Sequence, residues 1–431
     1  MAANADTAKL IQMASFRFVH SADVHLDSPL KGLAKVEGAT AERIRSATGE
    51  AFRNLVSRTI QEEAAFLVIS GDLYDGDWRD YQTGLRFVGQ MGRLRQAGIP
   101  AFLIYGNHDA QSTITRSLRL PDNVNVLSTR TPETLLLEKI GVALHGQGFR
   151  TRDVRDNLAK SYPPPVRGAF NIGLLHTGLA GAEDHAPYAP CTLPELRDKG
   201  YDYWALGHIH KPQVLHERPH VVYSGNVQGR HIRETGPRGA MLVTVEDGAV
   251  RAVEHMALDV VRWELLRCAV DDCETLADVH SEVRACVERA VGEQADGRLL
   301  ACRIEVTGRT AAHHAVLAAR EELLAQARAS ALGLGEETAW VEKIAASTRL
   351  PRGKKLDPSL VEAMGSLEDA RSDEGLIAEL RSRLQTFVAR LPHEVRDSAE
   401  SPLLASAAAA DMEAIVELAR PYALARLLDD R

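Results

Sequence analysis

An α/β fold is predicted by two features of this 431-residue sequence: its short apolar runs and the helical segments between them. The runs have the length and content of strands buried in a sheet, and helical spacing fills the intervals between the first three. This alternation of strand and helix is typical of the α/β class. The runs are Phe16–Val19, Ala65–Ile69, Ala101–Tyr105, Ile172–Leu175 and Trp204–Leu206, and the helical segments are Arg43–Ala64 and Tyr81–Ala97.

Further strands are expected in the same region, which we interpret as one domain of residues 15–260. Three of them follow the third run and look like a β-meander, and three more close the domain. Residues 1–14 are expected to form a disordered leader. The additional strands are Val124–Leu127, Thr134–Ile140, Val142–Leu144, Val221–Tyr223, Gly239–Val245 and Val250–Met256.

The rest of the chain is expected to form a smaller βαβαβ domain, residues 261–350, and a helical C-terminal region, residues 351–431. The last region contains two amphipathic segments, Glu374–Leu391 and Asp411–Leu428. The elements of the smaller domain are the strands Trp263–Val270, Leu299–Thr307 and Ala339–Ala346, and the helices Asp278–Val291 and Ala311–Ala331.

The composition is that of an ordinary soluble globular protein, with 45% hydrophobic and 26% charged residues. A net charge of -8 does not favour nucleic-acid binding by the whole surface, so a nuclease would need a local basic region. The five cysteines lack CxxC spacing, which favours free thiols in a reducing cytoplasm. Since no apolar run reaches the ~18 residues of a membrane span, we expect a cytoplasmic protein without membrane association.

Polar clusters follow the apolar runs at the points where the predicted strands end. Carboxyl ends of strands are where α/β folds bind ligands, so these clusters are expected to meet at one edge. Imidazole and carboxylate ligands without thiolate suit manganese, iron or zinc, and seven candidates are too many for one ion. Two neighbouring ions can together clamp a phosphate and activate water. The candidate metal ligands are Asp23, His25, Asp72, Asn107, His176, His208 and His210.

His108 is interpreted as a catalytic group rather than a ligand. It stands between Asn107 and Asp109, and a carboxylate bonded to an imidazole fixes its tautomer and raises its basicity. We therefore predict that Asp109 orients His108, and that His108 protonates the leaving oxygen or stabilises charge on the phosphoryl group.

The motifs DxH, GDxxD, GNHD, a lone His after a strand, and GHxH occur here in the order found in the calcineurin-like metallophosphoesterase superfamily, which the chain resembles. The segments Ser21–Pro29, Leu206–Gln213 and Tyr223–His231 look like those of SbcD-type DNA repair exonucleases, most closely the YhaO-like ones. The motif match covers about residues 16–234. The resemblance implies a four-layer α+β sandwich, with a capping domain and a tail that docks an SMC-like, SbcC-type ATPase.

The resemblance also implies a ligand set for each of two divalent ions, expected to be manganese, with iron(II) and zinc as alternatives. Asp72 would bridge the ions, and His108 would act on the leaving group. Asp75 departs from family members that carry a His there, so a contact to the scissile phosphate is absent or differently made. One ion would be held by Asp23, His25, Asp72 and His210, and the other by Asp72, Asn107, His176 and His208.

The substrate expected from the resemblance is DNA, as ends or duplex, cut by a manganese-dependent nuclease. Arg230, His231 and Arg233 could grip its phosphate backbone, because arginine forks onto phosphate oxygens. Two alternatives stay open: a phosphatase or small-molecule phosphodiesterase with the same metal core, and a weakly catalytic subunit that regulates an ATPase. Cleavage polarity, the native metal and a homodimeric state are also open.

Overall fold

The computed structural model describes most of the two predicted folded regions and parts of the C-terminal one. The predicted leader, residues 1–14, lies outside the described residues. The described residues are 15–31, 38–75, 82–111, 119–179, 188–351, 365, 369, 371–390, 406–407, 409 and 411–429.

The first of two six-stranded sheets has four parallel strands, β1 to β4, at its centre and one edge. Strands β11 and β12 extend it on the other edge, where β11 runs antiparallel to β1. The helices α1 (Gly38–Gln61) and α2 (Gln82–Gln96) connect β1 to β2 and β2 to β3. The strands are β1 (Phe16–Ser21), β2 (Phe66–Ser70), β3 (Ala101–Ile104), β4 (Val124–Val126), β11 (Gly239–Glu246) and β12 (Ala249–Ala257).

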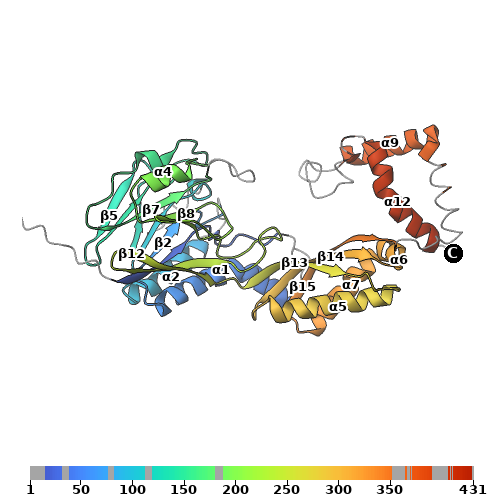
Figure 1. Cartoon of the computed structure of the whole chain (residues 1–431), viewed down its shortest axis with the longest axis horizontal. Helices are drawn as coiled ribbons and strands as arrows, with labels where there is room; N and C mark the ends of the chain where they lie inside the picture. Colours follow the sequence, from blue (N-terminus) through green and yellow to red (C-terminus); the bar gives the residue numbers. More distant parts are fainter. Residues whose placement is uncertain are drawn as a thin grey trace, which may run out of the picture. The chain divides into compact units, whose positions relative to one another are not determined.

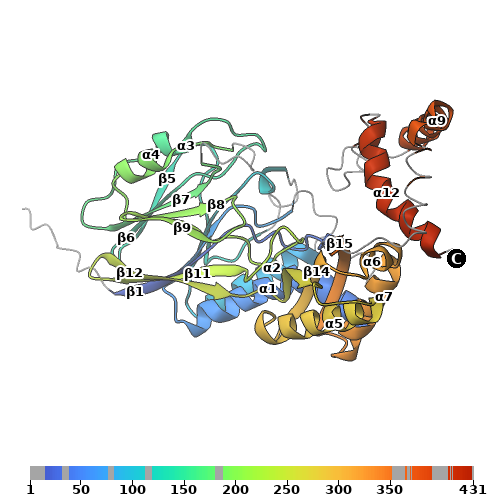
Figure 2. The ribbon, with the colours of Figure 1, turned by 45° about the vertical axis from the view of Figure 1, so that its right-hand side comes forward.

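The second sheet has the order β5-β6-β7-β8-β10-β9. Its four inner strands are parallel, and the edge strands β5 and β9 run antiparallel to their neighbours. The short helices α3 (Leu158–Ser161) and α4 (Leu193–Asp198) lie on its outer side (Figure 2). Leu196 of α4 packs on Trp204 of this sheet. The strands are β5 (Glu133–Leu137), β6 (Val142–Gly146), β7 (Phe170–His176), β8 (Tyr203–Gly207), β9 (Gln213–Glu217) and β10 (His220–Tyr223).

The two sheets face each other across one apolar layer, with helices on their outer sides (Figure 1). Because side chains alternate along a strand, Phe18 and Phe66 of the first sheet meet Ile172 and Tyr203 of the second. The rings of Phe18 and Phe66 stack with centroids 5.0 Å apart, and Tyr203 meets Phe18 edge-on. The α/β prediction is confirmed, and this domain is a four-layer sandwich.

The predicted meander is wrong. Strand β4 pairs with β3 in the first sheet, whereas β5 and β6 form a hairpin in the second, so the chain crosses between sheets after Val126. A short apolar run predicts that a segment is a strand but not which sheet it joins, so the error lies in the pairing.

Beyond the sandwich, a three-stranded sheet has the order β13-β14-β15. The segment predicted as one helix, Ala311–Ala331, is two helices, because Ala319 adopts φ -94° and ψ 28° and ends the first. Neither Gly nor Pro marks this break. The elements are β13 (Val261–Ala269), α5 (Leu276–Glu293), β14 (Leu299–Arg309), α6 (His313–Ala318), α7 (Arg320–Gly333) and β15 (Ala339–Arg349).

The described C-terminal residues include the helices α9 (Glu374–Ala389) and α12 (Met412–Asp429). Ile377 and Leu384 of α9 pack against Met412 and Ile415 of α12. The described chain divides into two compact units, one within residues 1–264, 294–301 and 336–338 and the other within the remaining residues; the boundaries 260/261 and 350/351 remain predictions. Among the described helices, none combines the length and apolarity needed to cross a bilayer.

Candidate metal centre

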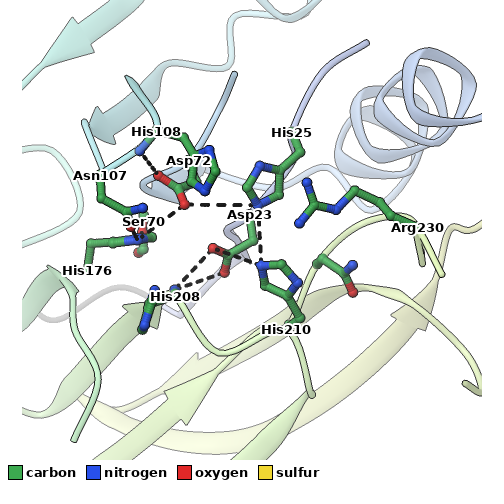
Figure 3. A network of polar contacts seen from close by, with 12 residues as sticks. Asp23, His25, Ser70, Asp72, Asn107, His108, His176, His208, His210 and Arg230 are labelled. Carbon is green, nitrogen blue, oxygen red and sulfur yellow. Dashed lines mark hydrogen bonds and ion pairs between the residues drawn. The ribbon is translucent and has the colours of Figure 1, made fainter. Parts of the chain in front are cut away.

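The polar motifs come together where the parallel strands of both sheets end (Figure 3). The first sheet contributes Asp23 and His25 after β1, Asp72 after β2, and Asn107 after β3. The second sheet contributes the last residue of β7, His176, and the two histidines that follow β8. This is the gathering at one edge that the strand ends predicted.

The backbone is strained at four residues of these motifs. Asp23, His25 and Asp72 have φ values of 49°, 46° and 52°, and His208 has 94°, in the left-handed region that non-glycine residues rarely adopt. Each such residue costs on the order of 1–3 kcal/mol. The conformation therefore persists only because contacts with the surrounding structure hold it in place. Here the loop after β1 is hydrogen-bonded to the loop after β2. The Asp23 N–H donates to the Gly71 carbonyl and the His25 N–H donates to the Asp72 carbonyl, both at 3.0 Å.

The glycines of the motifs leave room for the ligands. A side chain at Gly106 would run into the carboxylate and backbone nitrogen of Asp72. Gly71 combines φ +94° with contact to the His176 imidazole, so it provides both the turn and the space.

Donor atoms converge around two buried carboxylates, Asp72 and Asp23. The Asp72 Oδ2 atom lies 3.4 Å from His176 Nε2 and 3.9 Å from His25 Nε2. The Asp23 Oδ1 atom lies 3.8 Å from His210 Nε2. Ligand atoms lie within 4.8 Å of one another in three groups, which share members: Asp23, His25 and His210; His25, Asp72 and His108; Asp23, Asp72 and His176.

Two imidazoles are hydrogen-bonded through their Nδ1 atoms, and the Nδ1 atom of a third, His25, faces a carboxylate without a hydrogen bond; the Nε2 atoms of all three turn toward the cluster. The Nδ1 atom of His210 lies 2.6 Å from Glu234 Oε1, and that of His176 lies 2.9 Å from the Ser70 carbonyl. The Nδ1 atom of His25 lies 3.4 Å from Asp75 Oδ1. Metal-binding histidines are characteristically held in this way by an oxygen acceptor. Glu234 was missed from the sequence, because its link to His210 spans 24 residues outside any motif.

Two nitrogens face each other here, since His25 Nε2 and His210 Nε2 are 3.3 Å apart. Burial lowers the pKa of His25 to about 3, which keeps its imidazole in the neutral form that binds metal. Burial alone would lower the pKa of His176 as well, but the charge of Asp72 outweighs it and raises that pKa to about 9. The buried carboxylates thus attract positive charge, and the donor set fits borderline or hard divalent cations.

Six of the seven predicted ligands lie in this donor cluster. Asn107 belongs to it through its Oδ1 atom, 3.0 Å from His176 Nε2. His208 donates its backbone N–H to Asp23, and its ring lies beside His176, with centroids 5.3 Å apart, outside the three groups. The division of the ligands between two ions, with Asp72 as the bridge, remains a prediction.

Asp109 does not orient His108, which corrects the sequence-based prediction. Its two carboxylate oxygens accept hydrogen bonds from the backbone N–H groups of Leu73, Tyr74 and Gly106. The carboxylate that meets His108 is Asp75, whose Oδ1 atom lies 3.1 Å from His108 Nδ1. The turn after β3 sends neighbouring side chains in different directions, so adjacency in sequence misled. Asp75 also raises the pKa of His108.

The predicted phosphate-binding residues lie beside the cluster. The Arg230 guanidinium points toward His25 in Figure 3, and its Nη1 atom is 3.3 Å from Asp75 Oδ1. Arg230, His231 and Arg233 all line one cavity, of about 1000 Å³, together with His210. These residues therefore lie beside the metal centre, while their contact with DNA remains a prediction.

Comparison with known proteins identifies two matching domain families. Residues 16–212 match the calcineurin-like phosphoesterase model, and residues 263–349 match the middle domain of metallophosphoesterase YhaO. The chain is 38% identical over 266 residues to metallophosphoesterase YhaO of Bacillus subtilis (strain 168), covering 61% of this chain and 64% of the relative. It is 25% identical over 278 residues to the DNA double-strand break repair protein Mre11 of Methanopyrus kandleri, covering 56% and 57%.

The chain therefore spans less than two thirds of the length of these two relatives. Among solved structures, it is similar to a dimetal phosphatase from Danio rerio, with 12% sequence identity and a TM-score of 0.33. That match covers 56% of this chain and 96% of the phosphatase chain.

Proposed function

Because the chain carries a calcineurin-like phosphoesterase domain, as its motifs predicted, we propose that it is a two-metal hydrolase that cuts phosphodiester bonds in DNA. The observation that carries the proposal is the pair of shared carboxylates, Asp23 and Asp72, ringed by imidazole Nε2 atoms. Manganese is the expected metal, with iron(II) and zinc as alternatives, since all three accept this mixture of nitrogen and oxygen ligands.

Two divalent cations bound here would neutralise phosphate charge and lower the pKa of an attacking water. The protein's own contribution is positioning. His108 has a ring nitrogen within 4.8 Å of the ligand atoms of His25 and Asp72, and Asp75 favours its protonated form. A protonated His108 beside the scissile phosphate is placed to give its proton to the departing oxygen.

DNA is proposed as the substrate on two grounds. One is the 25% identity to a relative whose name is that of a DNA double-strand break repair protein. The other is the cation-lined cavity beside His210, which could hold a phosphate backbone despite the acidic total charge. The proposed role is therefore nucleolytic DNA repair of the SbcD type, in a cytoplasm that keeps the five free cysteines reduced.

The test is hydrolysis by the purified full chain, loaded with manganese, iron(II) or zinc. End-labelled linear duplex and single strands are compared with bis(p-nitrophenyl) phosphate and p-nitrophenyl phosphate, and Asp72→Asn is the inactive control. We expect metal-dependent cleavage of DNA and of the diester. Cleavage of the monoester alone would indicate a phosphatase, and no turnover of any substrate would favour a regulatory subunit.

We also propose that the helical C-terminal region docks an SMC-like ATPase. Leu376, Leu380 and Phe387 of α9 are exposed, while Ile377 and Leu384 of the same helix pack against α12. Exposed apolar side chains gathered on one helix are typical of partner surfaces. Co-purification with the SMC-like ATPase of the same organism should be lost in Leu376→Asp/Phe387→Asp. It should survive in Leu136→Asp, which changes an exposed leucine of β5; equal retention by both variants would refute the docking site.

A further inference from the structure

A cavity of about 1000 Å³ begins at the metal centre and runs along the loop after β10. His210 belongs both to the metal centre and to the cavity, since its Nε2 atom faces Asp23 and its side chain also lines the cavity. A substrate whose scissile phosphate lies against His210 would therefore extend directly into this space. The other lining residues that matter here are Lys211, Arg230, Arg233, Glu234 and Arg238.

The charge of this cavity is positive. Of the described residues that line it, Glu234 alone carries a carboxylate, and that group is already bonded to His210 Nδ1, Asn226 Nδ2 and the Arg230 N–H. Arg238 is also engaged, since its guanidinium donates to the carbonyls of His210 and Thr235.

Lys211 and Arg233 are differently placed. Both side chains are exposed, and neither has a hydrogen bond or ion pair within the part of the chain that the structure describes. Arg230 lies between the metal centre and the rest of the cavity (Figure 3). Its Nη1 atom is near Asp75 next to the metal centre, while its buried Nε atom has no partner among the described residues. Among the described residues, the cavity thus offers two cations without partners, Lys211 and Arg233, and a third, Arg230, that lies beside the metal centre.

We propose that this cavity is the subsite for the phosphate next to the scissile one. Lys211 and Arg233 would neutralise that second phosphate, and Arg230 would lie between the two. The enzyme would then select a polynucleotide strand over an isolated phosphoester, because only a strand carries a second phosphate at the required place. This inference rests on the proposed function and assigns the source of its substrate selectivity.

The chemistry of the lining favours a phosphate backbone. Lysine and arginine neutralise phosphates with release of counterions, which makes the affinity fall with salt concentration. Arginine also offers a planar fork of donors that fits phosphate oxygens. Contacts of this kind position a strand without reading its sequence, so the subsite is expected to be indifferent to base identity.

The binding test uses the full chain in EDTA, which prevents cleavage, and a fluorescein-labelled single-stranded oligodeoxynucleotide. Fluorescence anisotropy compares the wild type with Lys211→Gln/Arg233→Gln. The matched control is Lys139→Gln/Arg218→Gln, which removes two exposed cations that do not line the cavity. We expect the cavity variant to bind at least about tenfold more weakly, and the slope of log K against log salt to fall by about 1.4, as for two lost contacts to a single strand.

Equal affinities of the cavity and control variants would overturn the proposal, and so would failure of the wild type to bind the oligonucleotide. Unchanged thermal unfolding of both variants verifies that the loss is not one of folding. A second readout is the ratio of kcat/KM for the oligonucleotide to that for bis(p-nitrophenyl) phosphate, which has no second phosphate. A fall in this ratio supports the subsite, and equal loss on both substrates contradicts it. If the wild type hydrolyses neither substrate, the proposed function fails, while the binding result still decides on the subsite.

Discussion

Replacing Asp75 by asparagine removes the charge of this side chain but keeps its shape. In the structure its Oδ1 atom lies 3.1 Å from His108 Nδ1, and its Oδ2 atom accepts a hydrogen bond of 2.8 Å from the Ser28 hydroxyl. A hydrogen bond between the Asp75 carboxylate and a charged imidazole contributes about 1.5–3 kcal/mol. If the contact with His108 supplies this energy when His108 acts on the leaving oxygen, the loss of the contact should slow kcat about tenfold to hundredfold.

The assay is steady-state hydrolysis of bis(p-nitrophenyl) phosphate by the metal-loaded chain, in a double-mutant cycle with His108→Ala. His108→Ala alone should lower kcat by about 10²–10⁴, the usual contribution of a general acid. In that background Asp75→Asn should have little further effect, because a positioning residue has nothing left to position. Asp122→Asn, which changes a carboxylate that is 81% exposed, is the control and should leave kcat unchanged.

Metal content measured by mass spectrometry accompanies each variant and should stay at the wild-type value. If the effects of Asp75→Asn and His108→Ala simply multiply, Asp75 does not act through His108. If Asp75→Asn loses metal, its contact with His25, at 3.4 Å, is the one that matters, and the assignment to His108 is refuted.

Three further results are expected. Glu234→Gln removes the charge that holds His210 and should weaken metal binding about 10–100-fold in a metal titration, whereas unchanged affinity would deny Glu234 that role. Gly106→Ala should displace the Asp72 carboxylate, so the protein should fold with a wild-type far-UV spectrum yet bind less metal; full occupancy would contradict the steric argument. Burial lowers the pKa of His20 to about 3, so below pH ~6.5 the unfolded chain binds a proton that the folded chain does not, and stability falls by up to about 1.4 kcal/mol per pH unit. His20→Gln should flatten the decline of Tm between pH 6.5 and 4.5, and parallel declines in both proteins would show that His20 titrates normally when folded.

The parts of the metal centre that could be predicted from sequence are those that depend on strand ends. Each motif directly follows a buried apolar run, so the position of its ligands follows from the direction of the parallel strands. This is why Asp23, Asp72 and His176 were identified without knowledge of the sheet order. The short apolar runs likewise predicted most strands of the sandwich.

The remaining features depend on three-dimensional turns that periodicity does not encode. Asp109 was assigned to His108 because it is the next residue, yet Asp75, 33 positions earlier, meets the ring. Glu234 reaches His210 from a separate loop, and the break at Ala319 has no Gly or Pro to mark it. The two contacts join groups whose separation along the chain carries no signal, and the helix break depends on backbone angles at Ala319 that no residue type in the segment indicates.

Ser70 links the two halves of the sandwich at the metal centre. Its hydroxyl donates to the Ala205 carbonyl of the second sheet at 2.8 Å, and its own carbonyl lies 2.9 Å from His176 Nδ1. The ligands are therefore carried by two different sheets, and the apolar core between the sheets sets the distance between them. A change in the packing of this core, for example at the fully buried Phe66, would change the separation of Asp72 from His176. The preferred ionic radius can thus drift in evolution through residues that never touch an ion.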